Sequence, residues 1–218
     1  VEYFFTKVKM NLITYFTKLL HLFPGEISHY IALKGLKALY SLGLLKYLLI
    51  YDEKTSYENV HMKKLAKKLK FSNIKNRIGI AAGLDKNGDY IDCLASIGIG
   101  FIEVGTVTPK AQRGNPKPRL FRNIQDKSLL NRLGFNNKGV DYLVERLKNK
   151  KTDIIVGSSI GKNFDTPNEE AYKDYLYCLD KIYHLSDYIA INISSPNTKS
   201  LRDLSSKENL DFLLEQIK

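Results

Sequence analysis

A lysine that follows an apolar segment is the first residue of this sequence that suggests chemistry. Residues 77–81 are mostly apolar, and the string AAGLDKNG (residues 81–88) begins where they end. Its small residues allow a flat ligand to approach the backbone. Lys86 can place a cation beside a developing anion or the electron-rich edge of a cofactor. A surface lysine in a glycine-containing turn is the plainer alternative, and the string alone does not exclude it.

A serine takes the equivalent place after a later apolar segment. The string NISSPNT (residues 192–198) follows residues 188–191, and alternation along an extended chain puts Asn192 and Ser194 on one face and Ser195 on the other. A serine acts as a base only where another group takes its proton and the site is dry. No G-x-S-x-G elbow is present, which disfavours a hydrolase nucleophile. Ser, Pro and Asn also simply form turns.

Two stretches between these strings combine groups that suit a polar ligand. Thr106 and Thr108 lie in GTVTP (residues 105–109), where their hydroxyls could bond a cofactor ring or cap the next segment. Residues 131–137, NRLGFNN, mix amide donors, an aromatic ring and a glycine, which suits a planar, polar, anionic molecule. A Gly-Asn loop is also an ordinary turn, so each stretch has modest specificity alone.

Alternating strands and helices are expected to position these groups. Strands are predicted at residues 77–81, 100–104, 153–157 and 188–193, and helices at 87–97, 138–148, 168–185 and 207–218. Nearly continuous apolar strands that alternate with helices indicate a parallel α/β sheet, for which doubly wound and barrel folds both fit. The polar strings follow strand ends, where either fold builds its site. No GxGxxG follows the first strand, which disfavours a Rossmann dinucleotide site.

The first 70 residues differ from the rest in pattern and charge. Two amphipathic helices are expected, near residues 10–23 and 26–40, separated by Pro24-Gly25. Their apolar faces could pack on the main domain or meet lipid, and no apolar run reaches the ~20 residues of a membrane span. The net charge of the chain is +11, and residues 1–70 hold 12 Lys and Arg against 5 Asp and Glu. This excess suggests an anionic partner, lipid or nucleic acid.

Cysteine usage excludes some classes of site. Cys93 and Cys178 are far apart and have no metal-like spacing. A disulfide scaffold is therefore not expected, a reducing compartment fits the composition, and no metal site is predicted.

Five strings together resemble the class 2 dihydroorotate dehydrogenases, a family of quinone-using flavoenzymes. They are AAGLDKNG, IEVGTVTPKAQRGNPKPRLFR, NRLGFNNKGVD, IGKNFDTP, and YIAINISSPNT followed by SLR. They occur in the family's order and spacing and cover about residues 70–204. The string PGEISHYIALKGLKAL also resembles the family's N-terminal extension.

The resemblance implies a (β/α)8 TIM barrel preceded by an N-terminal α-helical hairpin. Residues 1–70 would form the membrane and quinone-tunnel region, and residues 71–218 an FMN-dependent catalytic domain, incomplete after about four βα units. The family's later strands carry a lysine that binds FMN and a glycine-rich phosphate site, which are not among these 218 residues. This segment by itself is therefore expected to bind FMN weakly or not at all.

The resemblance also assigns residues to the site. Those matching FMN contacts are Ala82, Gly83, Leu84, Asp85, Lys86, Thr106, Ser159 and Asn192. Those matching substrate contacts are Lys86, Asn131, Arg132, Leu133, Gly134, Phe135, Asn192 and Asn197. Ser195 matches the catalytic base, with Thr198 as a proton relay, and His29 and Arg122 match the quinone site. Ser159 departs from the pattern, because the family has Asn there, and the shorter side chain would bond through water or weaken the grip on FMN.

The implied reaction is the oxidation of dihydroorotate to orotate in de novo pyrimidine (UMP) biosynthesis. Ser195 would remove a proton from C5, hydride would pass from C6 to N5 of FMN, and ubiquinone or menaquinone would then take the electrons. The resemblance implies a monomeric, bacterial, peripheral protein on the cytoplasmic face of the inner membrane, with no nucleic-acid partner. Two alternatives stay open: another FMN-barrel pyrimidine oxidoreductase with a soluble acceptor, and an inactive membrane-binding fragment.

Overall fold

The described residues of this computed structural model form two compact units. The described residues are 14–48, 67, 77–198 and 200–218. Unit 1 combines residues 1–55 with residues 117–131, and unit 2 combines residues 56–116 with residues 132–218. A segment from the middle of the chain thus groups with the N-terminal residues.

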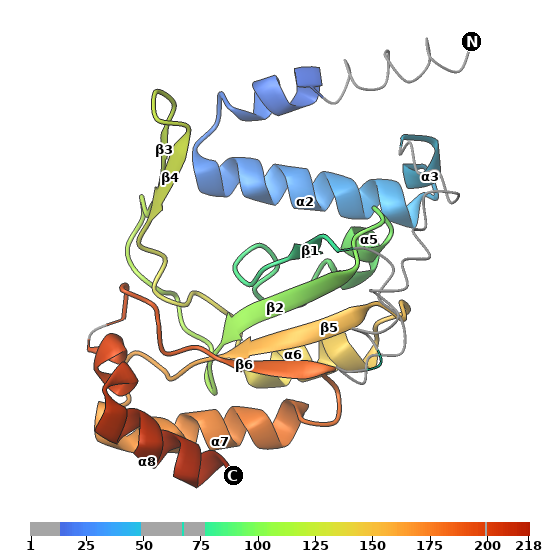
Figure 1. Cartoon of the computed structure of the whole chain (residues 1–218). Coiled ribbons are helices and arrows are strands. Elements are labelled where there is room, and N and C mark those ends of the chain that lie inside the picture. Colours follow the sequence, from blue (N-terminus) through green and yellow to red (C-terminus); the bar gives the residue numbers. More distant parts are fainter. Residues whose placement is uncertain (1–13, 49–66, 68–76, 199) are drawn as a thin grey trace. The chain divides into compact units, whose positions relative to one another are not determined.

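Unit 2 is built on a four-stranded parallel sheet (Figure 1). Its strands are β1 (Gly79–Ile80), β2 (Phe101–Val107), β5 (Ile155–Ile160) and β6 (Tyr188–Ile191). They pair in the order β1-β2-β5-β6, which follows the chain without reversal. A doubly wound sheet reverses its order at a switch point, whereas a TIM-barrel-like sheet does not. The order therefore favours the barrel over the doubly wound alternative.

Helices cover the sheet of unit 2. They are α5 (Ile91–Ala95), α6 (Val140–Lys148), α7 (Ala171–Ile182) and α8 (Lys207–Ile217), with 3-10 helices η2 (Asn168–Glu170) and η3 (Leu201–Ser205). Helix α7 lies between α6 and α8 (Figure 1). Its buried residues are Ala171, Tyr175, Cys178 and Ile182, which form one stripe at helical spacing. Strand β5, covered on both faces, is buried at every residue, as expected for a parallel sheet.

The predicted strands are correct in order and type, but β2 and β5 extend three residues beyond the predicted ends. The additional residues of these strands include Thr106 and Ser159, whose side chains are polar and buried. Thr106 Oγ1 and Ser159 Oγ lie 2.9 Å apart and hydrogen-bond each other. Because each hydroxyl has a hydrogen-bond partner in the other, polar residues can continue a buried strand.

Helix α5 begins four residues later than predicted. The preceding residues form a turn in which Gly88 has a φ of 72°, outside the helical region. The carboxylate of Asp85 accepts hydrogen bonds from the backbone N–H groups of Asp89 and Tyr90, at 2.9 and 2.7 Å. This side chain competes with helical hydrogen bonding and delays the start of the helix.

Unit 1 combines helices with a β-hairpin. Residues 14–20 are helical and are followed by α2 (Gly25–Ser41) and α3 (Leu45–Leu48), and the hairpin consists of β3 (Leu120–Asn123) and β4 (Ser128–Asn131). Helix α2 agrees with the predicted helix at residues 26–40, and residues 10–13 of the earlier predicted helix lie outside the described residues. Each hairpin strand has only four residues, too few for a recognisable alternation, so the sequence did not predict it.

Charged contacts hold this hairpin against the start of α2. Two guanidinium nitrogens of Arg119 donate to Glu26 Oε1, at 3.0 and 2.9 Å. Arg122 donates through Nη2 to Ser28 Oγ, at 2.7 Å. A Cβ atom at Gly25 would lie 2.8 Å from Leu120 Cδ2, so the glycine allows the strand to approach the helix closely. The hairpin and the beginning of α2 therefore form one packed body.

Much of the predicted N-terminal region, residues 1–70, lies outside the described residues, namely 1–13, 49–66 and 68–70. No helix in the described part of the chain is both long enough and apolar enough to cross a bilayer.

The close approach of β2 and β5 makes a stability prediction at Gly105. Its φ is +108°, and an added Cβ would lie 2.4 Å from the carbonyl oxygen of Ser159, which cannot easily move. We expect Gly105→Ala to lower the free energy of unfolding by about 2 kcal/mol or more, through overpacking and backbone strain. Urea unfolding monitored by circular dichroism would measure the loss.

Gly83→Ala is the matched control. Gly83 has nearly the same φ, +107°, but an added Cβ would meet nothing within 4 Å. The change in the free energy of unfolding of Gly83→Ala should therefore reflect backbone strain alone. Equal losses for the two variants would contradict the close approach at Gly105.

Candidate active site

The loop after β1 is fixed against the end of β2 by its backbone. Gly83 N donates to Gly105 O at 2.9 Å, and Gly105 N donates to Asp85 O at 3.1 Å. Lys86 Nζ donates to Gly83 O at 2.7 Å, which holds the ammonium group close to this turn. A cation is thus positioned at the carboxyl end of the sheet, as the sequence indicates.

Asp85 uses its carboxylate inside the loop. The side chain is buried, and its oxygens accept the backbone hydrogen bonds that shape the turn before α5. Burial raises the pKa of Asp85, because the charged form loses water, and the hydrogen bonds from Tyr90 and Asp89 partly offset this rise. Asp85 therefore stabilises the loop that carries Lys86 through hydrogen bonds within that loop.

Three side chains from three neighbouring strand ends form one hydrogen-bonded chain. Asn192 follows β6, and its Nδ2 donates to Thr106 Oγ1 at 2.8 Å. Thr106 Oγ1 is in turn bonded to Ser159 Oγ. The amide orientation of Asn192 is determined by Ser194, whose N–H donates to Asn192 Oδ1 at 3.1 Å. The chain therefore brings together residues that are far apart in sequence.

The hydrogen-bonded chain of Asn192, Thr106 and Ser159 leaves one buried hydrogen-bond donor unused. Thr106 and Ser159 have two hydroxyl hydrogens between them, and their mutual bond uses one. Within the described part of the structure, neither hydroxyl donates to any other protein acceptor. Both side chains are buried, and an unsatisfied buried donor is costly. The arrangement consequently suits a ligand that presents a hydrogen-bond acceptor to this position.

The loop after β6 presents the serine. Asn197 N donates to Ser195 Oγ at 3.2 Å, which would stabilise negative charge on this oxygen as it develops. Ser195 is half-buried. Thr198 Oγ1, three residues on, is buried without a hydrogen-bond partner in the described part of the chain. The Asn197 contact is also the pattern of a serine turn, so this geometry is compatible with both a base and a turn-forming residue.

Asn115 connects this serine loop to the segment after residue 131. Its Nδ2 donates to Arg132 O at 2.8 Å and makes a long contact with Asn197 O at 3.5 Å. Its backbone N–H donates to Leu133 O at 3.1 Å. An added Cβ on Gly134 would lie 2.9 Å from Asn115 Cγ. Residues 132–134 and 197 are therefore assembled around one amide side chain.

Phe135 completes this segment. Its φ of +52° is unusual for a residue with a side chain. The ring is buried, and an added Cβ on Gly161 would lie within 3.1 Å of both this ring and the Thr106 methyl group. The aromatic ring thus lies next to Thr106 of the hydroxyl chain.

Several amides and a lysine that support these loops escaped the sequence analysis. Asn163 Nδ2 donates to Thr108 Oγ1, Lys110 O and Gln112 Oε1, at distances from 2.9 to 3.1 Å. Lys162 Nζ donates to Thr166 O at 2.7 Å, and burial lowers the pKa of this lysine. Their signal in the sequence is the string IGKNFDTP, which contributed to the resemblance without any residue being assigned a role.

A hollow of about 700 Å³ lies between residues 109–116 and 163–174. Of the residues assigned to the site, Gly134 lines it, whereas Lys86, Thr106 and Ser195 do not. Charged side chains of η2 and α7 also line it, including Glu170 and Lys173, which pair with each other at 2.8 Å. The hydrogen-bonded chain at the strand ends, rather than this hollow, therefore marks the candidate site.

Comparison with known proteins decides the family. The family model described as dihydroorotate dehydrogenase matches residues 64–218. The chain belongs to the dihydroorotate dehydrogenase family.

Its relatives include bacterial proteins named dihydroorotate dehydrogenase (quinone). One from Acinetobacter baylyi is 60% identical over 143 residues, which are 66% of this chain and 43% of the relative. One from Psychrobacter arcticus is 60% identical over 150 residues, 69% of this chain and 43% of the relative. The chain spans less than half the length of these relatives.

Solved structures of Eimeria tenella dihydroorotate dehydrogenase resemble it in fold. The complex with ferulenol matches with a TM-score of 0.71 and 34% identity, covering 89% of this chain and 50% of the other. The ligand-free form matches with a TM-score of 0.62 and 40% identity, covering 66% and 42% of the two chains. These neighbours support a TIM-barrel-like fold for the parallel sheet.

Three residues that match dihydroorotate dehydrogenase site positions lie in unit 1. Asn131 ends β4, Arg122 lies on β3, and His29 lies on α2. Arg122 bonds Ser28, the neighbour of His29 in sequence, so the two residues matching the quinone site belong to one body. The other residues assigned to the site lie in unit 2.

A pH-dependent stability effect is expected in the loop that carries Lys86. Tyr142 OH donates to Asp89 Oδ1 at 2.6 Å, and Lys138 Nζ donates to Oδ2 at 3.0 Å. Burial alone would raise the pKa of Asp89, but these hydrogen bonds outweigh it and lower the pKa below its usual value. The stabilisation is therefore present above the ordinary carboxyl pKa and is lost as the pH falls through the lowered one.

Tyr142→Phe should reduce the free energy of unfolding by about 1 kcal/mol at pH 7. The difference from the parent protein should shrink as the pH falls below 3.8, the ordinary value for Asp. Urea unfolding at several pH values would measure both effects. Tyr183→Phe, on an exposed ring, is the control and should change stability by less than about 0.5 kcal/mol. A loss for Tyr142→Phe that did not vary with pH would contradict the role of Asp89.

Proposed function

We propose that this chain is part of an FMN-dependent enzyme that oxidises dihydroorotate to orotate and passes the electrons to a quinone, in de novo pyrimidine (UMP) biosynthesis. The observation that carries the proposal is the buried chain of Asn192, Thr106 and Ser159 with its unused donor, at the carboxyl ends of three parallel strands. Relatives named dihydroorotate dehydrogenase (quinone) support the same reaction.

The residues present fit FMN. A flavin ring presents carbonyl and ring-nitrogen acceptors along its polar edge, which suit the unused hydroxyl donor of Thr106 and Ser159. The residues proposed to hold it are Ala82, Gly83, Leu84, Asp85, Lys86, Thr106, Ser159 and Asn192. Gly83 leaves open space where a side chain would stand. The bound flavin supplies the electron sink that no amino-acid side chain provides.

The protein's own part in the reaction centres on Ser195. We propose that its Oγ takes the proton from C5 of the substrate, while the Asn197 N–H stabilises the oxygen. The hydroxyl of Thr198, which has no hydrogen-bond partner among the described residues, would relay that proton away from Ser195. Substrate contacts are proposed for Lys86, Asn131, Arg132, Leu133, Gly134, Phe135, Asn192 and Asn197. Lys86 would balance the charge of the anionic substrate.

The four parallel strands are proposed to be the first part of a (β/α)8 barrel, since the chain spans less than half of its relatives. The helical residues 14–20 and α2 are proposed to form a hairpin appended to that barrel. His29 and Arg122 would then border the quinone site. This division retains residues 1–70 as the membrane and quinone region and 71–218 as the catalytic domain.

Membrane contact is proposed for the N-terminal helices. Among the described residues, 21 large hydrophobic side chains are exposed, and 14 of them belong to unit 1. The described residues of unit 1 include eight Lys or Arg and two acidic residues. Exposed apolar groups beside excess positive charge are typical of proteins that lie on an anionic bilayer. Peripheral attachment to the cytoplasmic face of a bacterial inner membrane would bring the enzyme to its ubiquinone or menaquinone.

The reaction can be tested on the protein expressed from the whole gene that encodes this sequence. Dihydroorotate should bleach the visible flavin absorption, and Ser195→Ala should slow the bleaching by about a hundredfold or more, because no base remains. Flavin content should stay unchanged. Ser205→Ala, an exposed serine on η3, is the control and should bleach at the parent rate. A Ser195→Ala variant that bleaches equally fast would contradict the assignment of the base.

Ser159 offers a second test, read as cofactor affinity. Ser159→Ala removes the hydroxyl that orients Thr106 Oγ1, and the loss of this hydrogen bond, worth about 1 kcal/mol, should weaken FMN binding about fivefold. Recovery of FMN fluorescence on dilution would measure the dissociation constant. Ser158→Ala is the matched control, since Ser158 Oγ bonds Ser186 Oγ at 2.7 Å, away from Thr106. If both variants weakened FMN binding equally, the Ser159 hydroxyl would have no specific role in holding FMN.

A further inference from the structure

The β3–β4 hairpin exposes large apolar side chains at its turn and along its strands. Ile124, in the turn, is 83% exposed, and Leu130, on β4, is 70% exposed. Phe121 and Leu130 are cross-strand partners and therefore lie on the same face of the hairpin. Together with Ile124 at the turn, these side chains form a group of exposed apolar residues, and such patches mark interaction or membrane-contact sites.

On the opposite face, the residues of β3 already have partners, whereas Leu129 of β4 is also 66% exposed. Leu120 and Arg122 alternate with Phe121 along β3, and both contact the start of α2. Phe121 and Leu130 therefore point away from these contacts. Ile124 follows this strand directly and lies at the free end of the hairpin.

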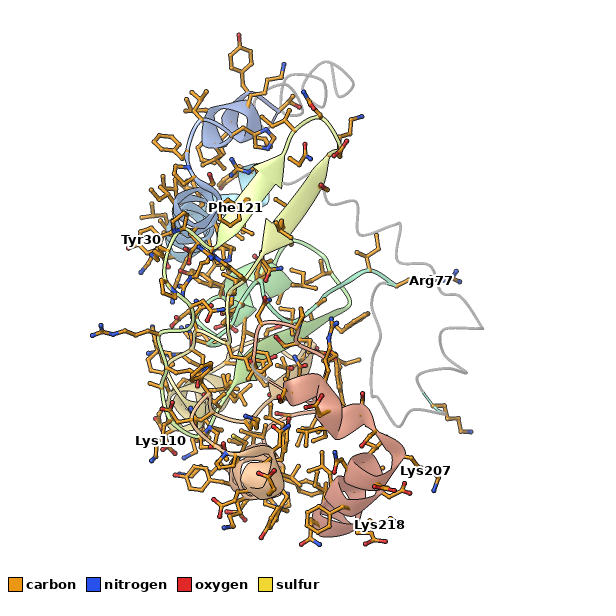
Figure 2. The ribbon with its side chains drawn as sticks, turned by 90° about the vertical axis from the view of Figure 1, so that its left-hand side faces the viewer. Tyr30, Arg77, Lys110, Phe121, Lys207 and Lys218 are labelled. Atoms are coloured by element: carbon orange, nitrogen blue, oxygen red, sulfur yellow. The ribbon has the colours of Figure 1, made fainter. Side chains whose placement is uncertain are left out.

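The turn is rigidly tied to the proposed membrane helices. Arg122 Nη1 donates to His21 O and Phe23 O, at 3.2 and 2.8 Å, where the first helical segment ends. Arg119 pairs with Glu26 in the first turn of α2. Figure 1 shows the hairpin rising beside the N-terminal end of α2, and Figure 2 labels Tyr30 and Phe121 in this region. A surface that meets the helices would therefore meet the hairpin as well.

The charges of unit 1 favour lipid over a second copy of this chain. Glu26, one of its two described acidic residues, is neutralised by Arg119. The other, Asp126, lies in the turn, where its carboxylate accepts a hydrogen bond from Asn123 Nδ2 at 2.6 Å, and Lys127 follows it. Two such positive surfaces would repel each other, whereas anionic headgroups would attract them.

We infer that the β3–β4 turn is a second membrane-contact element, in which Ile124 enters the interface of an anionic bilayer beside the N-terminal helices. The inference rests on the proposed membrane contact of those helices and adds a β-turn, from the middle of the chain, to that surface. Asp126 and Lys127 would remain at headgroup level, which limits the insertion to the aliphatic tip.

A tryptophan scan tests this directly, because the 218 residues contain no tryptophan. Ile124→Trp would be made in the protein expressed from the whole gene, and its emission read as the difference from the parent protein. Vesicles of phosphatidylcholine with phosphatidylglycerol should shift this emission to the blue, and brominated lipid should quench it. Phe164→Trp, at a 55% exposed aromatic position in unit 2, should respond to neither.

A second pair of variants measures membrane binding directly. Ile124→Glu should weaken flotation with the anionic vesicles by on the order of tenfold, because a carboxylate resists the interface and is repelled by the headgroups. Phe164→Glu should leave flotation unchanged. Both positions are exposed, so folding of the variants is expected.

The other outcomes separate this inference from the proposed function. If the parent protein floats but the signal from Ile124→Trp does not respond, the turn is not a contact element and only the helices bind. If the parent protein does not float at all, the proposed membrane contact fails and this inference fails with it. An emission of Ile124→Trp that shifts with protein concentration, without vesicles, would assign the turn to contact between copies and overturn the inference.

Discussion

Buried polar groups must be hydrogen-bonded, and this constraint organises the parallel sheet and its proposed active site. Strand β5 is buried at every residue and β2 is buried from Val104 onward, yet they carry Thr106 and Ser159 near their carboxyl ends. Each hydroxyl is acceptable there only because the other, together with Asn192, satisfies it. The pairing holds three strand ends in one arrangement, and its remaining donor leaves a specific need for a polar ligand. The same interaction thus serves both the sheet and the site.

The loops around the hydrogen-bonded side chains of Asn192, Thr106 and Ser159 are also held by hydrogen bonds. Asn115, Asn137 and Asn163 each make several hydrogen bonds to backbone or side-chain groups of neighbouring loops. An amide side chain offers both donors and acceptors, so one residue can join two or three segments. The candidate substrate segment and the serine loop are positioned mainly by such amides. A site assembled by rigid hydrogen bonds suits a reaction in which a proton and a hydride must leave adjacent atoms.

Unit 1 is organised differently. Leu33 and Leu45 are its only buried hydrophobic residues among those described. An ion pair from Arg119 and hydrogen bonds from Arg122 to backbone carbonyls join its parts. Its apolar side chains are mostly exposed. A soluble unit of this size would ordinarily bury them, so their exposure fits a surface that functions against lipid. The proposed division of labour follows, with chemistry in the hydrogen-bonded unit and quinone access in the apolar one.

The sequence by itself determined the parallel α/β class, the order of the four strands and the strings from which the family is recognised. These depend on local features: apolar runs of strand length, helical periodicity, and motif residues directly after strands. It did not predict the β3–β4 hairpin, because two four-residue strands carry too little periodicity and their stability comes from Arg119 and Arg122, which contact residues about a hundred positions away. Nor did it show that Asp85 turns inward or that Ser159 bonds Thr106. Only the tertiary structure decided these features, because a hydrogen bond between distant residues depends on where the fold places them.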